Sequence, residues 1–201
     1  MLDSLRQPLE SGECVIARAN HRVTYPARIQ LIAAMNPCRC GMAGEPGYRC
    51  ARGPRCQSDY QARISGPLLD RIDLRIDVPA ISASDLIRPA KSEPSSAVAE
   101  RVARARGIQT ARFAALGPTG AMTNAHCATK LIEEIAAPDA AGAALLYDAS
   151  EKLGFSARAY HRVLRVARTL ADLDGEAKVG RIHLAEAISY RVPGERLAQA
   201  A

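Results

Sequence analysis

Four of the six cysteines stand close together in the sequence, at Cys38, Cys40, Cys50 and Cys56. Four thiolates are the number of ligands that a structural tetrahedral zinc site needs. The spacing is unusual for such a site, because a single residue separates the first pair and five separate the second. The cysteines therefore allow two interpretations, which are a zinc site and four reduced thiols in a long loop.

The loop that holds these cysteines spans residues 36–61 and is rich in glycine and proline. Structureless connections longer than about 12–15 residues are uncommon in compact domains, so its length favours a bound metal. Its basic residues are Arg39, Arg49, Arg52 and Arg55. We expect a basic insert at this place, with or without zinc.

Positive charge is concentrated in the window from residue 14 to residue 63. The window holds eight arginines and two acidic residues, so its net charge of +6 equals the formal net charge of the whole chain. Such a window favours a polyanionic partner. The chain has no tryptophan, two phenylalanines and six tyrosines, which makes stacking on bases an improbable main mode of nucleic-acid binding. Any contact with nucleic acid should be carried by arginine.

A β-hairpin is expected over residues 14–25. Two β-prone runs, 14–17 and 22–25, flank a polar four-residue loop that begins at Arg18 and ends at His21. Arg22 follows directly, so the tip is basic. Charge alone leaves two interpretations open, namely a contact with phosphates and an ordinary solvated turn.

Two further segments of the first part are expected to be strands. Residues 29–35 are apolar almost without interruption, as in a strand that is buried on both faces of a parallel sheet. This strand should end at Asn36. Residues 72–78 alternate apolar and charged side chains, which is typical of an edge or half-buried strand. The first part is therefore expected to be α/β.

The second part of the chain is expected to be entirely helical. The clearest helix spans 156–173, with Ser156 as its N-cap, Gly175 as its stop and an apolar stripe at helical spacing. Further helices are expected at 98–116, 131–136, 140–153 and 184–190. The predicted organisation is an α/β part at 1–81 with the cysteine insert at 38–56, a linker at 82–96, a helical domain at 97–192 and a tail at 193–201.

The composition excludes several classes of protein. The chain has 201 residues, 48% of them hydrophobic, so it can bury a core. No apolar run approaches the roughly 18–20 residues that cross a bilayer, and the N-terminus lacks the layout of a signal peptide. We therefore expect a cytoplasmic protein without a membrane partner, in which cysteines remain reduced or bind metal.

Three stretches carry a resemblance to a known family. IQLIAAMNPCRCG, ISGPLLDRIDLRIDVP and FSARAYHRVLRVARTLADLDG closely resemble the YifB/ComM family of magnesium-chelatase-like AAA+ ATPases. The match covers almost the whole chain. It implies the C-terminal part of an AAA+ nucleotide domain, with a partial parallel sheet, followed by an all-helical lid. It also implies that the 14–25 hairpin is a pre-sensor-1 hairpin, in which Arg18, His21 and Arg22 grip a DNA backbone.

The resemblance assigns three residues to ATP chemistry. Asn36 matches sensor 1, whose amide orients the attacking water near the γ-phosphate. Arg71 matches the arginine finger that reaches a neighbouring subunit's nucleotide. Arg158 matches sensor 2, a lid arginine that contacts the phosphates. Arginine suits both positions because its guanidinium binds phosphate oxygens bidentately and stays charged.

One departure from the family is clear. The sequence contains no G-x-x-x-x-G-K-[ST] motif and no apolar strand ending in an acidic pair, so the P-loop and the residues that hold Mg²⁺ are missing. Met1 stands where the family continues upstream. The chain therefore resembles a fragment, a sequence with a mis-assigned start or a decayed copy, and alone it is expected neither to bind nor to hydrolyse ATP.

The resemblance implies part of a hexameric, ATP- and Mg²⁺-dependent DNA motor. It is similar to the branch-migration helicase that acts in natural transformation and recombination, with DNA bound without sequence preference. One alternative is a magnesium-chelatase-type motor subunit that acts on a protein client. The other is a non-enzymatic, zinc-stabilised nucleic-acid-binding module, which the missing P-loop favours.

Overall fold

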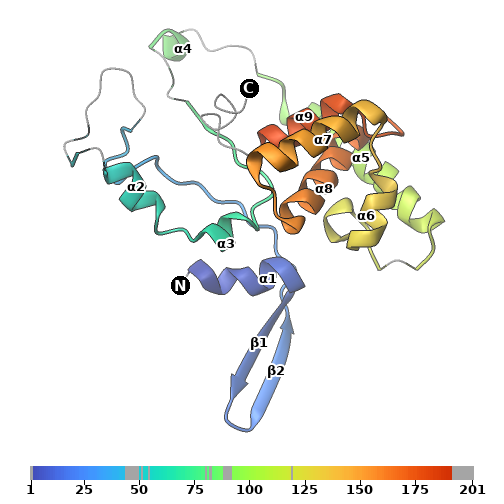
Figure 1. The fold of residues 1–201 in the computed structure, drawn as a ribbon, viewed down its shortest axis with the longest axis horizontal. Coiled ribbons are helices and arrows are strands. Elements are labelled where there is room, and N and C mark those ends of the chain that lie inside the picture. Colours follow the sequence, from blue (N-terminus) through green and yellow to red (C-terminus); the bar gives the residue numbers. More distant parts are fainter. Residues whose placement is uncertain are drawn as a thin grey trace. The chain divides into compact units, whose positions relative to one another are not determined.

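The computed structural model describes residues 2–43, 50, 52–53, 55–79, 81, 83–87, 92–118 and 120–191 (Figure 1). The expected tail at 193–201 lies outside the described residues, as do parts of the linker and of the cysteine insert. The chain forms two compact units, Met1–Ile72 and Asp73–Ala201, which are described separately below. The described secondary structure is mostly helical, with one small antiparallel hairpin. No described helix is long and apolar enough to cross a membrane.

The first unit opens with a short 3-10 helix, η1 (Leu2–Leu5), and helix α1 (Arg6–Ser11). Gly12 ends α1 with a φ of 70°, and its N–H donates to the carbonyl of Pro8 over 3.0 Å. A side chain at this glycine would be strained by the positive φ, and its Cβ would lie 3.0 Å from Cγ of Arg28, so the arginine side chain would have to shift. The N–H of Ala27 donates to the Gly12 carbonyl over 2.7 Å, which fastens the base of the hairpin to α1.

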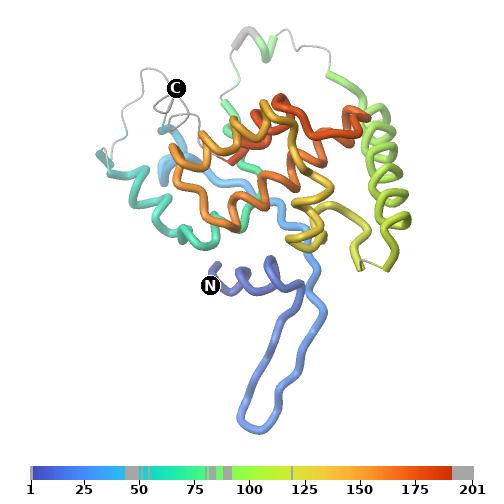
Figure 2. Tube along the Cα trace, turned by 45° about the vertical axis from the view of Figure 1, so that its right-hand side comes forward, coloured from blue at the N-terminus to red at the C-terminus, as the bar shows by residue number. Residues whose placement is uncertain are grey.

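The hairpin consists of β1 (Glu13–Arg18) and β2 (His21–Pro26), and the tube in Figure 2 shows the two strands running together to a narrow tip. Arg18 pairs with His21, so the turn has two residues and the expected four-residue loop is wrong. Ala19 adopts a φ of 40°. A positive φ at the first turn residue gives a two-residue turn whose twist matches that of the strands, which is why pairing extends to the tip.

The two further strands expected from the sequence are not formed. Residues 27–36 and 74–79 are irregular, and the only sheet among the described residues is the β1–β2 hairpin. Side chains expected to be buried are exposed, since Ile32 is 86% exposed and Ile76 is 68% exposed. A strand is stabilised by hydrogen bonds to a neighbour. In the part of the chain that the structure describes, neither segment pairs with another strand, and the N–H of Arg75 donates instead to the carbonyl of Tyr190 over 2.7 Å. The expected parallel sheet is therefore not formed here, and the observed sheet is the hairpin.

Two short helices complete the first unit. They are α2 (Cys56–Gln61) and α3 (Gly66–Leu69). Oγ of Ser65 caps α3 by accepting from the N–H of Leu68 over 3.3 Å. The Nε2 amide of Gln61 donates to the carbonyl of Pro37 over 3.2 Å, and this bond ties α2 to the beginning of the cysteine insert.

The second unit is a helical bundle built around one central helix, α8 (Ala157–Asp174), which lies against α5, α6, α9 and η2 (Figure 1). The other elements are α4 (Ala83–Ile87), α5 (Ser95–Ala115), η2 (Asn124–His126), α6 (Thr129–Ile135), α7 (Ala140–Leu153) and α9 (Arg181–Ser189). The helices expected from the sequence are therefore confirmed, with ends that differ by up to three residues. The helical lid boundaries at 97–192 stay a prediction.

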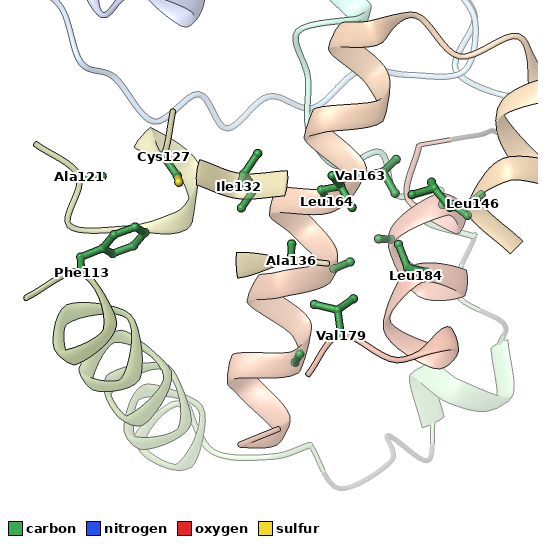
Figure 3. Close-up of a cluster of buried hydrophobic side chains, with 14 residues drawn as sticks. Phe113, Ala121, Cys127, Ile132, Ala136, Leu146, Val163, Leu164, Val179 and Leu184 are labelled. Carbon is green, nitrogen blue, oxygen red and sulfur yellow. The ribbon is translucent and has the colours of Figure 1, made fainter. Parts of the chain in front are cut away.

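The predicted N-cap and stop of α8 are both observed. Oγ of Ser156 accepts from the N–H of Ala159 over 3.1 Å, and Gly175 adopts a φ of 76° just after the last turn. The predicted apolar stripe of α8 faces the core, where Leu164 packs among Ile132 and Leu184 (Figure 3). Burial of such a stripe against neighbouring helices is the main source of stability for a helical bundle.

Candidate functional site

The four clustered cysteines come together in space, as the zinc-site interpretation of the sequence requires. Their Sγ atoms all lie within 4.8 Å of one another. Sγ of Cys40 is 2.8 Å from Sγ of Cys38 and 3.2 Å from Sγ of Cys50. A tetrahedral zinc ion with Zn–S distances of about 2.3 Å places its sulfurs about 3.8 Å apart, within the observed spread. All six cysteines are free thiols, so the donor set of the cluster fits zinc.

Two glycine turns bring the sulfurs together. The N–H of Gly41 donates to the carbonyl of Cys38, and the N–H of Gly53 donates to the carbonyl of Cys50, each over 3.0 Å. The two glycines have φ values of 84° and 83°, a region that favours glycine. Cys56 supplies the fourth sulfur from the first residue of α2. The unusual spacing in the sequence is thus accommodated by two similar turns and a helix start.

The thiols of the cluster differ in their readiness to ionise. The hydrogen bond from Cys40 lowers the pKa of Cys38 to about 6, helped by backbone N–H groups. The same bond raises the pKa of Cys40 to about 11. Hydrogen bonding to Cys40 also lowers the pKa of Cys50. Metals bind thiolates, and the lowered pKa values of Cys38 and Cys50 favour this ionised form. A metal would have to displace the proton of Cys40, whose pKa is raised.

The hairpin presents its basic residues at its tip. Arg18 and His21 are cross-strand partners on one face, whereas Arg22 lies opposite Ala17 on the other face. All three basic side chains are exposed. None of them forms an ion pair with any carboxylate among the residues that are described. The tip therefore offers cationic groups from both faces of the hairpin.

Asn36, expected at the end of a strand, instead ends the irregular segment before the cysteine insert. Its side chain is exposed and lies beside the first glycine turn. A Cβ placed on Gly41 would lie 3.9 Å from Nδ2 of Asn36. The side chain of Asn36, the sensor 1 candidate, therefore lies near the glycine turn that carries Cys38 and Cys40.

Arg71 is buried and held by an acidic partner within its own unit. The side chain is 9% exposed, and Nε donates to Oε2 of Glu10 over 2.9 Å. Nη2 donates to the same oxygen, and Nη1 donates to the carbonyl of Pro67 over 2.7 Å. To reach another subunit's nucleotide, this arginine has to leave Glu10. Sequence reasoning missed Glu10, which is 61 residues away and carries no local signal.

Arg158 lies in the first turn of α8, where its side chain is exposed. Further along α8, Arg162 forms an ion pair with Asp73, and Nη2 of Arg165 donates to the carbonyl of Cys127 over 2.9 Å. Arg158 belongs to the second unit, whereas Asn36 and Arg71 belong to the first. The three candidate ATP residues are therefore divided between the two compact units.

A buried polar network in the second unit was not predicted. The fully buried carboxylate of Asp172 accepts from Nε of Arg168 over 3.1 Å, from Nη1 of Arg112 over 3.1 Å and from Nδ2 of Asn124 over 2.8 Å. Burial alone would raise the pKa of Asp172, but these partners lower it below its usual value. The network joins α5, η2 and α8. The only sequence signal for it is the i, i+4 spacing of Arg168 and Asp172.

Comparison with known sequences defines the class of this protein. Residues 1–86 match the family described as magnesium chelatase, subunit ChlI, and residues 92–191 match the C-terminal part of the same subunit. The chain belongs to this magnesium chelatase ChlI-like family, in the ComM/YifB group, as the resemblance indicated.

Individual relatives match nearly the whole chain. It is 44% identical over 192 residues to the competence protein ComM of Haemophilus influenzae, covering 95% of this chain and 36% of that protein. It is 39% identical over 191 residues to the uncharacterized protein YifB of Escherichia coli, with 94% and 36% coverage. An uncharacterized protein of Mycobacterium tuberculosis is 38% identical over 195 residues, with 97% and 38% coverage. The chain thus spans little more than a third of these relatives.

Proposed function

We propose that this chain is the DNA-contacting, C-terminal part of an ATP-dependent AAA+ motor of the ComM type. The observation that carries the proposal is the exposed basic tip of the β1–β2 hairpin, in a chain 44% identical to a protein named for competence. Competence is the uptake of DNA by a cell, so a basic hairpin has a natural polyanionic partner. Arg18, His21 and Arg22 contact the phosphate backbone and read no sequence.

In this proposal the segments 29–35 and 72–78, which are irregular in the structure, become strands of an α/β AAA+ domain only where a longer chain supplies neighbouring strands. Asn36 then orients the attacking water, and Arg158 contacts the phosphates from the lid. Arg71 exchanges Glu10 for the nucleotide of a neighbouring subunit in a hexameric ring. ATP and Mg²⁺ are bound by a longer chain that includes a P-loop, since this sequence has none. The division at residues 82–96 separates the nucleotide domain from the lid.

The alternative of a zinc-stabilised nucleic-acid-binding module without enzymatic activity is favoured by the cysteine cluster. The four sulfurs within 4.8 Å of one another form a unit that needs no nucleotide. A chelatase motor that acts on a protein client is less well supported, because the basic hairpin suits a polyanion better than a protein surface. DNA binding separates the first two functions from the third.

The hairpin can be tested by fluorescence anisotropy of the 201-residue chain with a labelled DNA duplex. The double variant R18A/R22A should weaken binding at least about tenfold. It should also reduce the slope of log Kobs against log salt by about 1.8, since each phosphate contact contributes about 0.9. The control R104A/R106A removes the same charge from exposed positions of α5 and should retain the wild-type slope. Equal slopes in the wild type and R18A/R22A would remove the hairpin from the proposal.

A further inference from the structure

An exposed arginine lies next to the first cysteine pair, another lies in the second glycine turn, and a third lies at the start of α2. Arg39 lies between Cys38 and Cys40, Arg52 precedes the second turn glycine, and Arg55 directly precedes Cys56. Cys38 is 0% exposed and Cys56 is 8% exposed, whereas the side chains of all three arginines are exposed. Two of the four cysteines are therefore buried and two, Cys40 and Cys50, are half-buried, whereas the three arginine side chains lie at the surface.

Among the residues that the structure describes, no carboxylate neutralises these three guanidinium groups. Within the described ranges, none of Arg39, Arg52 and Arg55 forms an ion pair. Arg101 and Arg162 of the second unit, by contrast, are each paired with a carboxylate. An unpaired, exposed guanidinium is free to bind phosphate oxygens bidentately.

Local backbone structure is formed at each of these arginines. Arg39 and Arg52 stand within segments closed by the two N–H to carbonyl bonds of 3.0 Å at Gly41 and Gly53, and Arg55 is the N-cap residue of α2. A tetrathiolate metal site would lock the three segments to one another. Its net negative charge would sit on sulfurs of buried and half-buried cysteines, while the positive groups remain exposed at the surface. Such preorganisation reduces the entropy that binding must offset.

We propose that Arg39, Arg52 and Arg55 form a second DNA-binding surface, separate from the hairpin, whose geometry is maintained by a zinc ion on the four cysteines. The ligand is the phosphodiester backbone of duplex DNA, contacted without sequence preference. This inference deepens the alternative of a zinc-stabilised nucleic-acid-binding module, because it names the side chains that contact DNA, and it requires neither ATP nor the hairpin. It makes the insert an active part of DNA recognition instead of a structural loop.

The test compares the variant R39A/R52A/R55A with the wild-type chain in the anisotropy assay with a DNA duplex. The triple variant should lower the slope of log Kobs against log salt by about 2.7, for three lost phosphate contacts, and weaken binding at least about tenfold. Zinc content, measured in parallel by inductively coupled plasma mass spectrometry, should remain at the wild-type level. The matched control R104A/R106A/R181A removes three arginines at exposed positions of α5 and α9 and should bind as the wild type does.

Two results would overturn the proposal. The first is unchanged DNA affinity in R39A/R52A/R55A. Unchanged affinity with reduced zinc content would show that the arginines serve only to balance the charge of the thiolates. The second is full DNA affinity after a chelator has removed the zinc, since the surface is proposed to depend on the metal. Because R18A/R22A is measured in the same assay, the contributions of the insert and of the hairpin to DNA affinity are determined separately. Loss of one proposal therefore leaves the other to be judged by its own variant.

Discussion

The buried carboxylate of Asp172 gives the most direct test of what holds the helical unit together. Its side chain is fully buried between Arg168, which is 1% exposed, and Arg112, which is 19% exposed. The change Asp172→Asn preserves the shape of the side chain but removes its charge. The two arginines are then left facing one another without a counter-charge in a buried site.

The cost of this change follows from the burial of the pair. Breaking a buried ion pair by removing one partner costs about 3–5 kcal/mol, a large fraction of the roughly 5–15 kcal/mol that stabilises a typical domain. The second family match covers residues 92–191, and for a domain of that size the loss lowers Tm by about 15 °C or more. Differential scanning calorimetry of the full chain measures it. An exposed carboxylate of the same helix, changed in Asp174→Asn, is the matched control and should cost less than about 1 kcal/mol.

The effect of Asp172 should also depend on pH. Its partners lower its pKa in the folded state below the value of about 3.9 expected in the unfolded chain. Its stabilising contribution is therefore complete well above pH 4 and is lost as the pH falls through the folded-state pKa. The Tm difference between the wild type and Asp172→Asn should be full at pH 7 and should narrow below about pH 4. A Tm at pH 7 that is unchanged by Asp172→Asn would refute the assigned role of the network.

Two other features lead to simpler measurements. The chain purified without a polyhistidine tag should contain one zinc ion per chain by mass spectrometry, and Cys56→Ser should lower this to less than about a tenth, because three thiolates leave the site incomplete. Less than a tenth of an equivalent in the wild type would contradict the metal site. Ala19→Gly should relieve the positive φ of 40° at the hairpin turn by about 1 kcal/mol and slow amide hydrogen exchange in β1 and β2 roughly fivefold. Faster exchange in this variant would show that the turn is not strained.

The features that were predictable from the sequence depend on local chemistry. Ser156, Gly175 and the apolar stripe between them define α8 without reference to the rest of the chain. The cysteine cluster was predictable because zinc sites have a fixed number and type of ligand. In both cases the residues that carry the information are close together in the sequence.

The features that were missed depend on distant partners. The apolar run at 29–35 resembles a buried strand, but a strand needs a neighbour, and the described residues supply none. Glu10 and Arg71 are 61 residues apart, and Arg112 and Asp172 are 60 residues apart. No local sequence pattern predicts ion pairs between residues that are so far apart in the chain. The hairpin turn was wrong by two residues because pairing up to Arg18 and His21 depends on the backbone conformation of Ala19.

The two segments expected to be strands differ in how they would behave at high protein concentration. Residues 29–35 form an uncharged, apolar run without proline, and its Ile32 is 86% exposed. These are the properties of a segment that stacks with its copies into cross-β aggregates. Residues 72–78 place Asp73, Arg75 and Asp77 between their apolar side chains, and such charges act as gatekeepers against self-association. Aggregation of the purified chain would thus begin at the segment before Asn36.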